Sequence, residues 1–428
     1  MLRRSLIQAL GTAGLFSAPA IAASAKMHAT ATPNFQAIDP ARWSAFNASE
    51  LNLLMQTHGK TSKKYNPHKK PYAVFDWDNT CIMNDCEEAL LVYQIDHLAF
   101  KLNPSEFAGV LRTGVPNGPF KTEAGYKNTE GNAVRMEDIA DDVEADYRWI
   151  HANYKGFSGT MTLEQIQGTE QFKDFRAKLC FMYEAICDTH PIEVGYKWII
   201  YLYKNMTPSE LQALAEASHD HNLGDALRKL KMPSSDKIPG KAGQVVASHF
   251  FGVRIHGEIV NLMNTLRANG FDVYVSTASI DDVVRVFAAN PKYGYNVPTE
   301  NVIGLRLEMQ DGKYTNVYRK DWIFNWGPGK TVGIKNELVA KKGYGPALVA
   351  GDSDGDAWML NDFADTRIGV IVNRIKTGEI GERSKAAAAA IGKPGARFIL
   401  QGRNENTGLF MPDEKTLKLG KTEAKLLA

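Results

Sequence analysis

Residues 71–80 read Pro-Tyr-Ala-Val-Phe-Asp-Trp-Asp-Asn-Thr, and the rest of the chain is best interpreted from this stretch. A short apolar run between a proline and a polar turn predicts a strand that is buried on both faces. Asp76 and Asp78 stand at its carboxyl end, where burial of two carboxylates is costly unless a cation pairs with them. Mg²⁺ takes such hard oxygen ligands. On its own the stretch also fits a turn, in which Asp, Asn and Thr side chains bond to the local backbone.

Three more buried strands are predicted far downstream, at 271–276, 346–351 and 367–373. Apolar residues recur at helical spacing on either side of the first of them, over 258–269 and 280–289. Strands that alternate with helices in this way predict a parallel, Rossmann-like α/β sheet. The carboxyl ends of parallel strands meet at one edge of a sheet, and this edge is where ligands bind in open α/β folds.

The segment 83–249 does not continue this alternation. Its apolar residues follow helical spacing in five stretches that Gly, Pro and Asn separate, at 87–102, 137–154, 162–187, 193–204 and 208–230. We therefore predict a large helical cap that is inserted after the first strand. The cap would divide the α/β core into residues 26–82 and 250–375.

Two further elements are predicted outside this framework. The pair Asp311-Gly312, between two apolar segments, is typical of the turn of a β-hairpin. The C-terminal extension 376–428 contains an alanine run, Ala386 to Ala390, and the apolar stretch 396–400. These patterns predict an extra helix and an extra strand packed on the core.

The composition indicates a globular protein. Apolar residues make up 44% of the 428 residues and charged residues 23%, which excludes a disordered, collagen-like or simple coiled-coil chain. The formal net charge is +2, too small to favour a nucleic-acid partner. No run of eighteen apolar residues is present, so no membrane span is expected. The sequence carries no signal for the oligomeric state.

Residues 1–25 have the pattern of a signal peptide. A basic start is followed by a short apolar stretch and then by small residues, with cleavage expected after Ala22 or Ala25. Arg3-Arg4 also fits a twin-arginine signal, and the ordinary secretory route stays open. The mature protein is therefore expected to be periplasmic or secreted.

Four cysteines are present, at positions 81, 86, 180 and 187. Export permits a disulfide, but Cys180 and Cys187 lie seven positions apart on a predicted helix, about 10 Å along its axis, which is too far for a bridge. The other pairings stay open. The chain has no Cys-x-x-Cys motif, so a structural zinc site is not expected.

Chemically suited residues also follow the other predicted strands. Ser276 and Thr277 end the second strand, where hydroxyls and free backbone N–H groups hold phosphate oxygens. Lys330 follows Gly-Pro-Gly at the start of a predicted helix, and this position favours it over Lys335. A second acidic group follows the third strand, in the sequence Gly-Asp-Ser-Asp-Gly-Asp at 351–356. Each piece alone is a weak signal, but their order is specific.

In this order the motifs resemble those of the haloacid dehalogenase-like hydrolase superfamily, over about residues 65–82 and 250–375. The resemblance implies that Asp76 is a nucleophile that forms an aspartyl-phosphate. Asp78 would be the general acid for the leaving group and then the base for water, a position typical of the phosphatase branch. Lys330 would neutralise the phosphoryl charge.

The resemblance also implies a ligand set for phosphate and for Mg²⁺. Ser276 and Thr277 would bind phosphoryl oxygens together with Lys330. Mg²⁺ would be held by Asp76, Asp352 and the backbone carbonyl of Asp78. Asp356 would be a further ligand or an anchor for the others. Asp354 is left outside the ligand set.

Within the superfamily, the export signal, the Asp-x-Asp-Asn-Thr motif and the helical cap resemble exported bacterial phosphocholine phosphatases. Phosphoserine phosphatase-like enzymes are wider relatives. The resemblance implies a Mg²⁺-dependent hydrolase of a small phosphomonoester, with phosphocholine the first expectation. A phosphoserine phosphatase, and a phosphotransferase that uses the same aspartyl-phosphate, stay open. A non-enzymatic binding protein would not need this set of residues.

A quaternary ammonium substrate requires aromatic faces and a nearby carboxylate. The cap offers Glu87 and Glu88, shortly after the first motif, and many aromatic residues, of which we single out Tyr93 and Trp149. Aromatic residues at helical spacing are also common core residues, and the sequence does not show which of them face the site.

Overall fold

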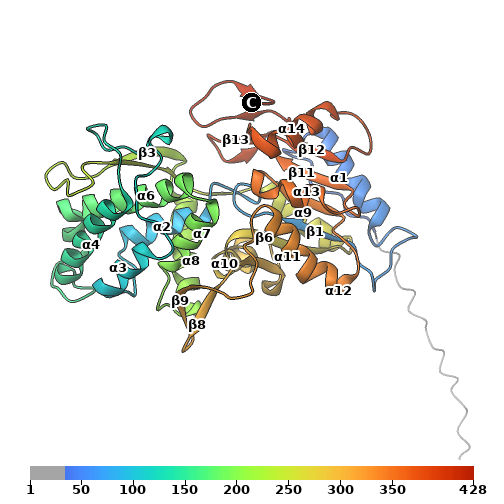
Figure 1. Ribbon diagram of the computed structural model, residues 1–428. Coiled ribbons are helices and arrows are strands. Elements are labelled where there is room, and N and C mark those ends of the chain that lie inside the picture. The colour runs from blue at the N-terminus through green and yellow to red at the C-terminus, as the bar shows by residue number, and fades with distance from the viewer. Residues whose placement is uncertain (1–33) are drawn as a thin grey trace, which may run out of the picture. The chain divides into compact units, whose positions relative to one another are not determined.

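The fold is built around a six-stranded parallel sheet with the strand order β12-β11-β10-β1-β6-β7 (Figure 1). The computed structural model describes residues 34–428, so the predicted signal peptide lies outside the described residues. The strands of this sheet are β1 (Tyr72–Phe75), β6 (Asp272–Ile280), β7 (Val302–Leu305), β10 (Leu348–Gly351), β11 (Ile368–Val372) and β12 (Phe398–Gln401). The predicted parallel α/β fold is confirmed.

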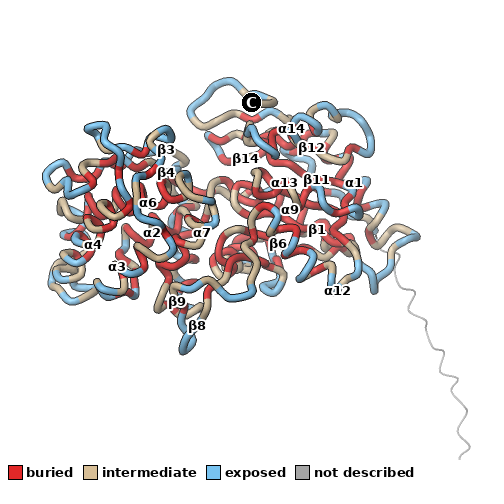
Figure 2. The backbone as a smooth tube through the Cα atoms, viewed as in Figure 1, coloured by how far each residue is buried: buried red, intermediate tan, exposed pale blue. Residues whose placement is uncertain are grey.

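Strand β1 lies between β6 and β10, and its residues alternate between two hydrophobic cores. Ala73 and Phe75 pack on the side of the sheet that α1 and α9 cover, whereas Tyr72 and Val74 pack on the side of α11, α13 and α14. Both faces are covered, which is why all four β1 residues are apolar and fully buried (Figure 2). The core helices are α1 (Ala45–His58), α9 (Gly257–Ala268), α10 (Asp281–Ala289), α11 (Pro328–Ile334), α12 (Ala340–Lys342), α13 (Ala357–Asn361) and α14 (Gly378–Ala389).

Seven helices and one hairpin form the insertion after β1. They are α2 (Cys86–Asp96), α3 (Pro104–Arg112), α4 (Met136–Asn153), α5 (Leu163–Gln167), α6 (Glu170–Thr189), α7 (Ile192–Tyr201), α8 (Pro208–Gly224), β3 (Arg228–Pro233) and β4 (Val246–Phe251). The chain leaves and returns through two short antiparallel strands, β2 (Ile82–Met83) and β5 (Arg254–Ile255). We call residues 86–251 the cap.

Four predictions for the cap are wrong in detail. The helix predicted over 208–230 ends at Gly224, and residues 228–233 pair with β4 instead. The helix predicted over 162–187 is two helices, since Thr169 caps a new one. The helix predicted over 87–102 ends at Asp96. Helix α3 was missed, although Asn103 and Glu106 form a capping box at its start and Pro104 occupies its first position.

The predicted hairpin is confirmed as β8 (Leu307–Gln310) and β9 (Lys313–Tyr318). Asp311 and Gly312 both have positive φ, 52° and 73°, as a two-residue type I′ turn requires. The hairpin belongs to the core but also contacts the cap, where the Tyr314 N–H donates to the Met206 carbonyl at 2.8 Å. It therefore ties the two parts together.

The C-terminal residues complete the sheet and then add a small one. After α14, β12 pairs with β11 as the edge strand of the main sheet. Four two-residue strands follow, β13 (Arg403–Asn404), β14 (Leu409–Phe410), β15 (Thr416–Leu417) and β16 (Ala424–Lys425), in the order β14-β13-β15-β16. We call these residues, 403–425, the tail sheet.

Two negative findings concern residues 34–428. No helix there is long and apolar enough to cross a membrane. The four cysteines all lie in this part of the chain and are free thiols. Cys180 and Cys187 share the continuous helix α6, which keeps them apart as predicted.

Candidate active site

Lys330 lies at the centre of a buried charge cluster at the carboxyl edge of the sheet. Its Nζ donates to Oδ1 of Asp76 at 2.5 Å and to Oδ1 of Asp356 at 2.7 Å. Its side chain is 2% exposed. Helix α11 begins at Pro328 and places Lys330 in its first turn, whereas Lys335 is exposed to solvent. The structure thus brings Lys330, and not Lys335, to the two aspartates.

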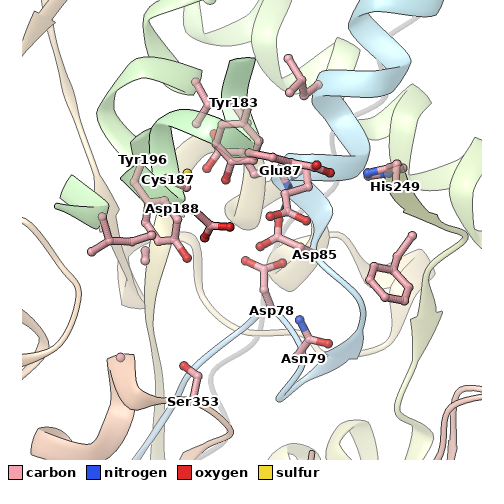
Figure 3. Close-up of a pocket in the computed structure, with 18 of the residues that line it drawn as sticks. Asp78, Asn79, Asp85, Glu87, Tyr183, Cys187, Asp188, Tyr196, His249 and Ser353 are labelled. Atoms are coloured by element: carbon pink, nitrogen blue, oxygen red, sulfur yellow. Dashed lines mark hydrogen bonds between the residues drawn. The ribbon is translucent and has the colours of Figure 1, made fainter. Parts of the chain in front are cut away.

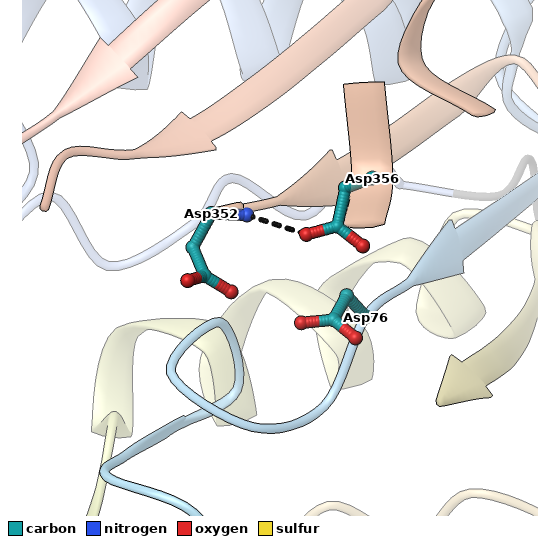
Figure 4. A group of neighbouring side chains, drawn as sticks. All are labelled: Asp76, Asp352 and Asp356. Carbon is teal, nitrogen blue, oxygen red and sulfur yellow. Dashed lines mark hydrogen bonds between the residues drawn. The ribbon is translucent and has the colours of Figure 1, made fainter. Parts of the chain in front are cut away.

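Asp76, Asp352 and Asp356 each contribute a carboxylate oxygen to a group in which these atoms lie within 4.8 Å of one another (Figure 4). Lys330 and Arg374 are the cations in contact with them, since Arg374 Nη1 donates to Asp352 Oδ2 at 2.6 Å. Burial raises the pKa of Asp76 well above its usual range, with the Asp356 charge acting in the same direction. A cluster of hard oxygen donors with surplus negative charge fits Mg²⁺.

Asp356 is held as an anchor within this cluster. Its Oδ2 accepts the backbone N–H groups of Asp352 at 2.9 Å and Ser353 at 3.1 Å, while its Oδ1 accepts Lys330. Asp352 keeps Oδ1 near the Thr80 hydroxyl, which lies 2.9 Å from it. The Asp352 and Asp76 carboxylates are therefore the better candidates for direct metal ligands.

Asp78 lies beside the cluster and faces the cap. Its Oδ1 accepts the Cys86 N–H and its Oδ2 accepts the Ser279 hydroxyl, each at 2.8 Å. Burial raises the pKa of Asp78, and the two hydrogen bonds oppose this shift. A carboxyl with a raised pKa at this place is suited to hold and release a proton.

The hydroxyls predicted to bind phosphate lie differently from expectation. Ser276 and Thr277 are fully buried and are not among the residues that line the cavity. Ser276 Oγ is hydrogen-bonded to the Asn325 amide, and Thr277 Oγ1 accepts the Ser279 N–H at 3.1 Å. The strand β6 continues to Ile280, four residues beyond its predicted end, so Ala278 and Ser279 reach the cavity instead. The hydroxyl residues within 276–279 indicated that this edge of the sheet binds a ligand. They did not indicate which of the hydroxyls reaches the cavity.

A cavity of about 770 Å³ lies between the sheet edge and the cap (Figure 3). Asp76, Asp78, Lys330 and Asp352 line its floor. The cap wall carries carboxylates from Asp85, Glu87, Glu88, Glu184 and Asp188. Aromatic side chains come from Tyr126, Phe181, Tyr183, Tyr196, Phe250 and Trp326. Besides Lys330, the basic residues at the cavity are Lys229, Arg374 and Lys376. The cap wall therefore favours a cation.

Glu87 and Glu88 both line this cavity, in different situations. Glu87 is 5% exposed, and its carboxylate accepts the Ile280 N–H at 3.0 Å and the Tyr203 hydroxyl at 3.2 Å. Burial raises the pKa of Glu87 to about 8. The Glu87 side chain thus connects helix α2 to the end of strand β6. Burial and the Asp78 charge raise the pKa of Glu88. Glu88 is only half-buried, whereas the Glu87 carboxylate is buried and already hydrogen-bonded, so Glu88 is the better carboxylate to meet a ligand.

The expectation for Tyr93 and Trp149 is not met, because neither lines the cavity. Tyr93 stacks on His97 with ring centroids 3.9 Å apart, and Trp149 packs against the hydrophobic core from α4. Tyr183 and Tyr196, from α6 and α7, lie at the cavity instead (Figure 3). Tyr183 was one of several aromatic candidates, and Tyr196 was missed because nothing local marks the helix face that meets the core.

Comparison with known proteins finds that the chain is similar to a phosphatase. It is similar to the phosphorylcholine phosphatase of Pseudomonas aeruginosa, with 28% identity over 376 residues that cover 81% of this chain and 84% of that protein. No family model matches the chain.

A solved structure is similar over nearly its whole length. A conserved protein of unknown function from Anaerococcus prevotii has 34% identity and a TM-score of 0.84, over 89% of this chain and 98% of that one. A substrate-bound phosphoserine phosphatase has 12% identity over 71% of this chain and 86% of its own. Its TM-score of 0.31 is too low to bear on the function.

Proposed function

We propose that the protein is a Mg²⁺-dependent phosphomonoesterase that works through an aspartyl-phosphate on Asp76 and prefers phosphocholine. The observation that carries the proposal is the contact of buried Lys330 with Asp76 at the floor of the cavity, with Asp78 beside it on the cap side. A nucleophile, a neutralising cation and a proton donor then face one substrate.

The chemistry follows from these positions. The Asp76 carboxylate attacks phosphorus, the bond to the leaving oxygen breaks, and Asp78 gives that oxygen its proton. Asp78, now a carboxylate, then takes a proton from water as the water attacks phosphorus and releases Asp76. Lys330 neutralises phosphoryl charge throughout. Mg²⁺ held by Asp76, Asp352 and the Asp78 carbonyl would supply further neutralisation of the phosphoryl oxygens.

The cap wall supports a cationic leaving group. Tyr183 and Tyr196 offer aromatic faces, and Asp85 and Glu88 offer carboxyl groups, which together suit a quaternary ammonium. The named substrate of the Pseudomonas relative agrees with this chemistry. Phosphoserine would instead need a cation for its carboxylate. Arg374 is already paired with Asp352, which leaves Lys229 and Lys376 among the basic residues of the cavity for that role.

The first test is phosphate release from phosphocholine, phosphoethanolamine, phosphoserine and p-nitrophenyl phosphate, with Mg²⁺ and with EDTA. We expect phosphocholine to have the highest kcat/KM, and EDTA or Asp76→Asn to abolish turnover. Asp236→Asn, which changes a carboxylate that is 68% exposed, is the control. Full activity of Asp76→Asn would refute the nucleophile, and a preference for phosphoserine would refute the choline assignment. Added alcohols separate hydrolysis from transfer, because a phosphotransferase forms phosphorylated alcohol in place of phosphate.

The aromatic pocket has its own test. Removal of one cation–π contact costs about 1–2 kcal/mol, so Tyr196→Leu should raise KM for phosphocholine about tenfold. KM for p-nitrophenyl phosphate, which has no cation, should change little. Tyr93→Leu is the matched control, since this tyrosine lies outside the cavity. An equal rise of KM for both esters would argue against the pocket.

We also propose that the protein is exported, to the periplasm or beyond the cell. The support is the pattern of residues 1–25. Fractionation of expressing cells and the mass of the mature protein test it, with cleavage expected after Ala22 or Ala25. Retention of the intact chain in the cytoplasm would contradict it.

A further inference from the structure

Arg403 joins the tail sheet to the loop that carries the reactive aspartates. Its side chain is 1% exposed, Nη1 donates to the Asn79 carbonyl at 3.0 Å, and Nη2 donates to Asn79 Oδ1 at 3.3 Å. Asn79 directly follows Asp78 and has a φ of 63°, in the left-handed region. One guanidinium thus holds both the backbone and the side chain of the residue at which this loop turns.

Arg403 is itself held in place from the tail sheet. Its Nη2 donates to Glu405 Oε1 at 2.9 Å, and its backbone N–H donates to Thr416 Oγ1 at 3.0 Å. Glu405, which is 5% exposed, also accepts Lys418 Nζ at 2.8 Å. The chain of contacts therefore runs from Lys418 through Glu405 and Arg403 to Asn79.

A buried charge chain of this kind is a poor way to gain stability. Desolvation of buried ions can exceed their mutual attraction, and apolar residues of similar size often stabilise a fold as well or better. The Arg403 guanidinium presents a planar set of hydrogen-bond donors at a fixed place and orientation, which an apolar side chain cannot do. Its target is one residue away from the proposed general acid.

The tail sheet also contacts the loop that follows β11. Thr416 Oγ1 donates to the Asn373 carbonyl at 2.6 Å, and the Asn373 amide donates to the carbonyls of Glu414 and Leu426. The next residue, Arg374, contacts Asp352. The tail sheet thus contacts two of the loops that carry residues of the carboxylate cluster or contact it.

We propose that Arg403 is a positioning residue for Asp78, and that the tail sheet is the part of the fold that presents it. The inference rests on the proposed function. The Arg403 fork fixes the turn at Asn79, and the turn fixes the backbone from which the Asp78 carboxyl reaches the leaving oxygen. Misplacement of a proton donor matters most for substrates whose leaving group is a poor one.

The test compares two esters in Arg403→Met and Arg403→Lys. Choline leaves phosphocholine as an alkoxide unless its oxygen is protonated, whereas p-nitrophenolate leaves its ester without much help. General acid catalysis contributes about 10²–10⁴-fold, so Arg403→Met should lower kcat for phosphocholine about 30-fold or more, and for p-nitrophenyl phosphate only a few-fold. Arg403→Lys should fall between, because one ammonium replaces a fork of donors.

Two further variants keep the test decisive. Arg397→Met removes another arginine from this region, one that donates to the Leu360 and Phe363 carbonyls away from the cavity, and it should affect both esters equally. Glu405→Gln leaves Arg403 in place but weakens the contact that holds its guanidinium. If Arg403→Met does not fold, this variant tests the inference. It should show the same selective loss on a smaller scale.

Each outcome has a distinct meaning. Equal loss of kcat for both esters in Arg403→Lys and Glu405→Gln, together with a lower Tm, would show a merely structural role and overturn the inference. Unchanged kcat for both esters would overturn it as well. If the wild-type protein hydrolyses neither ester, the proposed function fails before the inference is reached.

Discussion

At the scale of single residues, the charges at the floor of the cavity are arranged around Lys330. Three buried carboxylates surround one lysine and one arginine, so the floor carries an excess of negative charge. Burial alone would lower the pKa of Lys330, but Asp356 and Asp76 raise it above its usual value. The lysine therefore stays charged at any pH at which the protein is folded.

Lys330→Gln should remove both activity and stability. Loss of a preorganised charge at the transition state lowers kcat by about 10²–10³-fold or more. Asp76 and Asp356 then lose their buried partner, which costs about 3–5 kcal/mol of unfolding free energy. Added Mg²⁺ should recover part of the Tm but not of kcat, because a divalent cation offsets the same excess charge. Calorimetry with and without Mg²⁺ checks this, and Lys335→Gln, at an exposed position, is the control.

Glu87 should make stability fall with rising pH. Its pKa in the folded protein is about 8, against about 4.5 for an ordinary glutamate, so the native state binds a proton that the unfolded chain releases. Its contribution to stability is therefore present below pH 4.5 and is lost as pH rises through 8. Glu87→Gln keeps an acceptor for the Ile280 N–H but cannot ionise.

The measurement is the unfolding midpoint of both proteins between pH 5 and pH 9. We expect the midpoint of the wild-type protein to fall more steeply than that of Glu87→Gln. Parallel curves would mean that Glu87 does not titrate in this range.

At the scale of elements, the conformations of turns and helix ends follow from the residue types at those positions. Gly270 follows the end of α9 with a φ of 89°, and Asp311-Gly312 forms the turn of the β8–β9 hairpin as predicted. The pairing of β3 with β4 could not be predicted in this way. Residues 228–233 combine three basic residues with Leu, Met and Pro, a composition that does not indicate a strand, and in the structure they pair with residues 246–251.

Two glycines give a matched test of these element-level rules. An added Cβ meets nothing within 4 Å at either Gly109 or Gly312, so only the backbone conformation differs. Gly109 lies inside α3, where Ala is favoured, and Gly109→Ala should raise the unfolding free energy by about 0.5–1 kcal/mol. Gly312 has a φ of 73°, and Gly312→Ala should lower it by about 1 kcal/mol. Denaturant unfolding of the two variants checks the opposite signs.

At the scale of the whole molecule, three histidines limit stability in acid, of which His219 and His256 are buried and His249 is half-buried. Burial lowers the pKa of His219 and of His249 to about 4 and that of His256 to about 3. These histidines bind protons near pH 6.5 in the unfolded chain, but only at lower pH in the folded protein. Stability is therefore lost as pH falls from 6.5 through 4. The histidines lie in the cap and in the core, so both parts should loosen together.

His219→Phe should reduce this acid sensitivity. The ring stacks on Phe287 at 4.4 Å, and an aromatic replacement keeps this contact without a titrating group. Circular dichroism between pH 4 and pH 7 should show a shallower loss of structure than in the wild-type protein. His68→Phe, which changes an exposed histidine, should leave the acid profile unchanged.

Local sequence determined the framework of this protein. The strand at 72–75, the acidic ends of β1 and β10, the lysine of α11 and the position of the insertion were all predictable, because burial of apolar runs and the chemistry of turns are expressed over a few residues. The order of the motifs along the chain then placed them at one edge of a parallel sheet.

Only the tertiary structure decided which side chains line the cavity. That Ser279 reaches it and Ser276 does not depends on where β6 ends against its neighbours. That Tyr196 lines it and Tyr93 does not depends on which faces of the cap helices meet the core. The contact of Arg403 with Asn79 joins residues 324 positions apart. Such contacts are set by the packing of the entire fold, and no local pattern in the sequence encodes them.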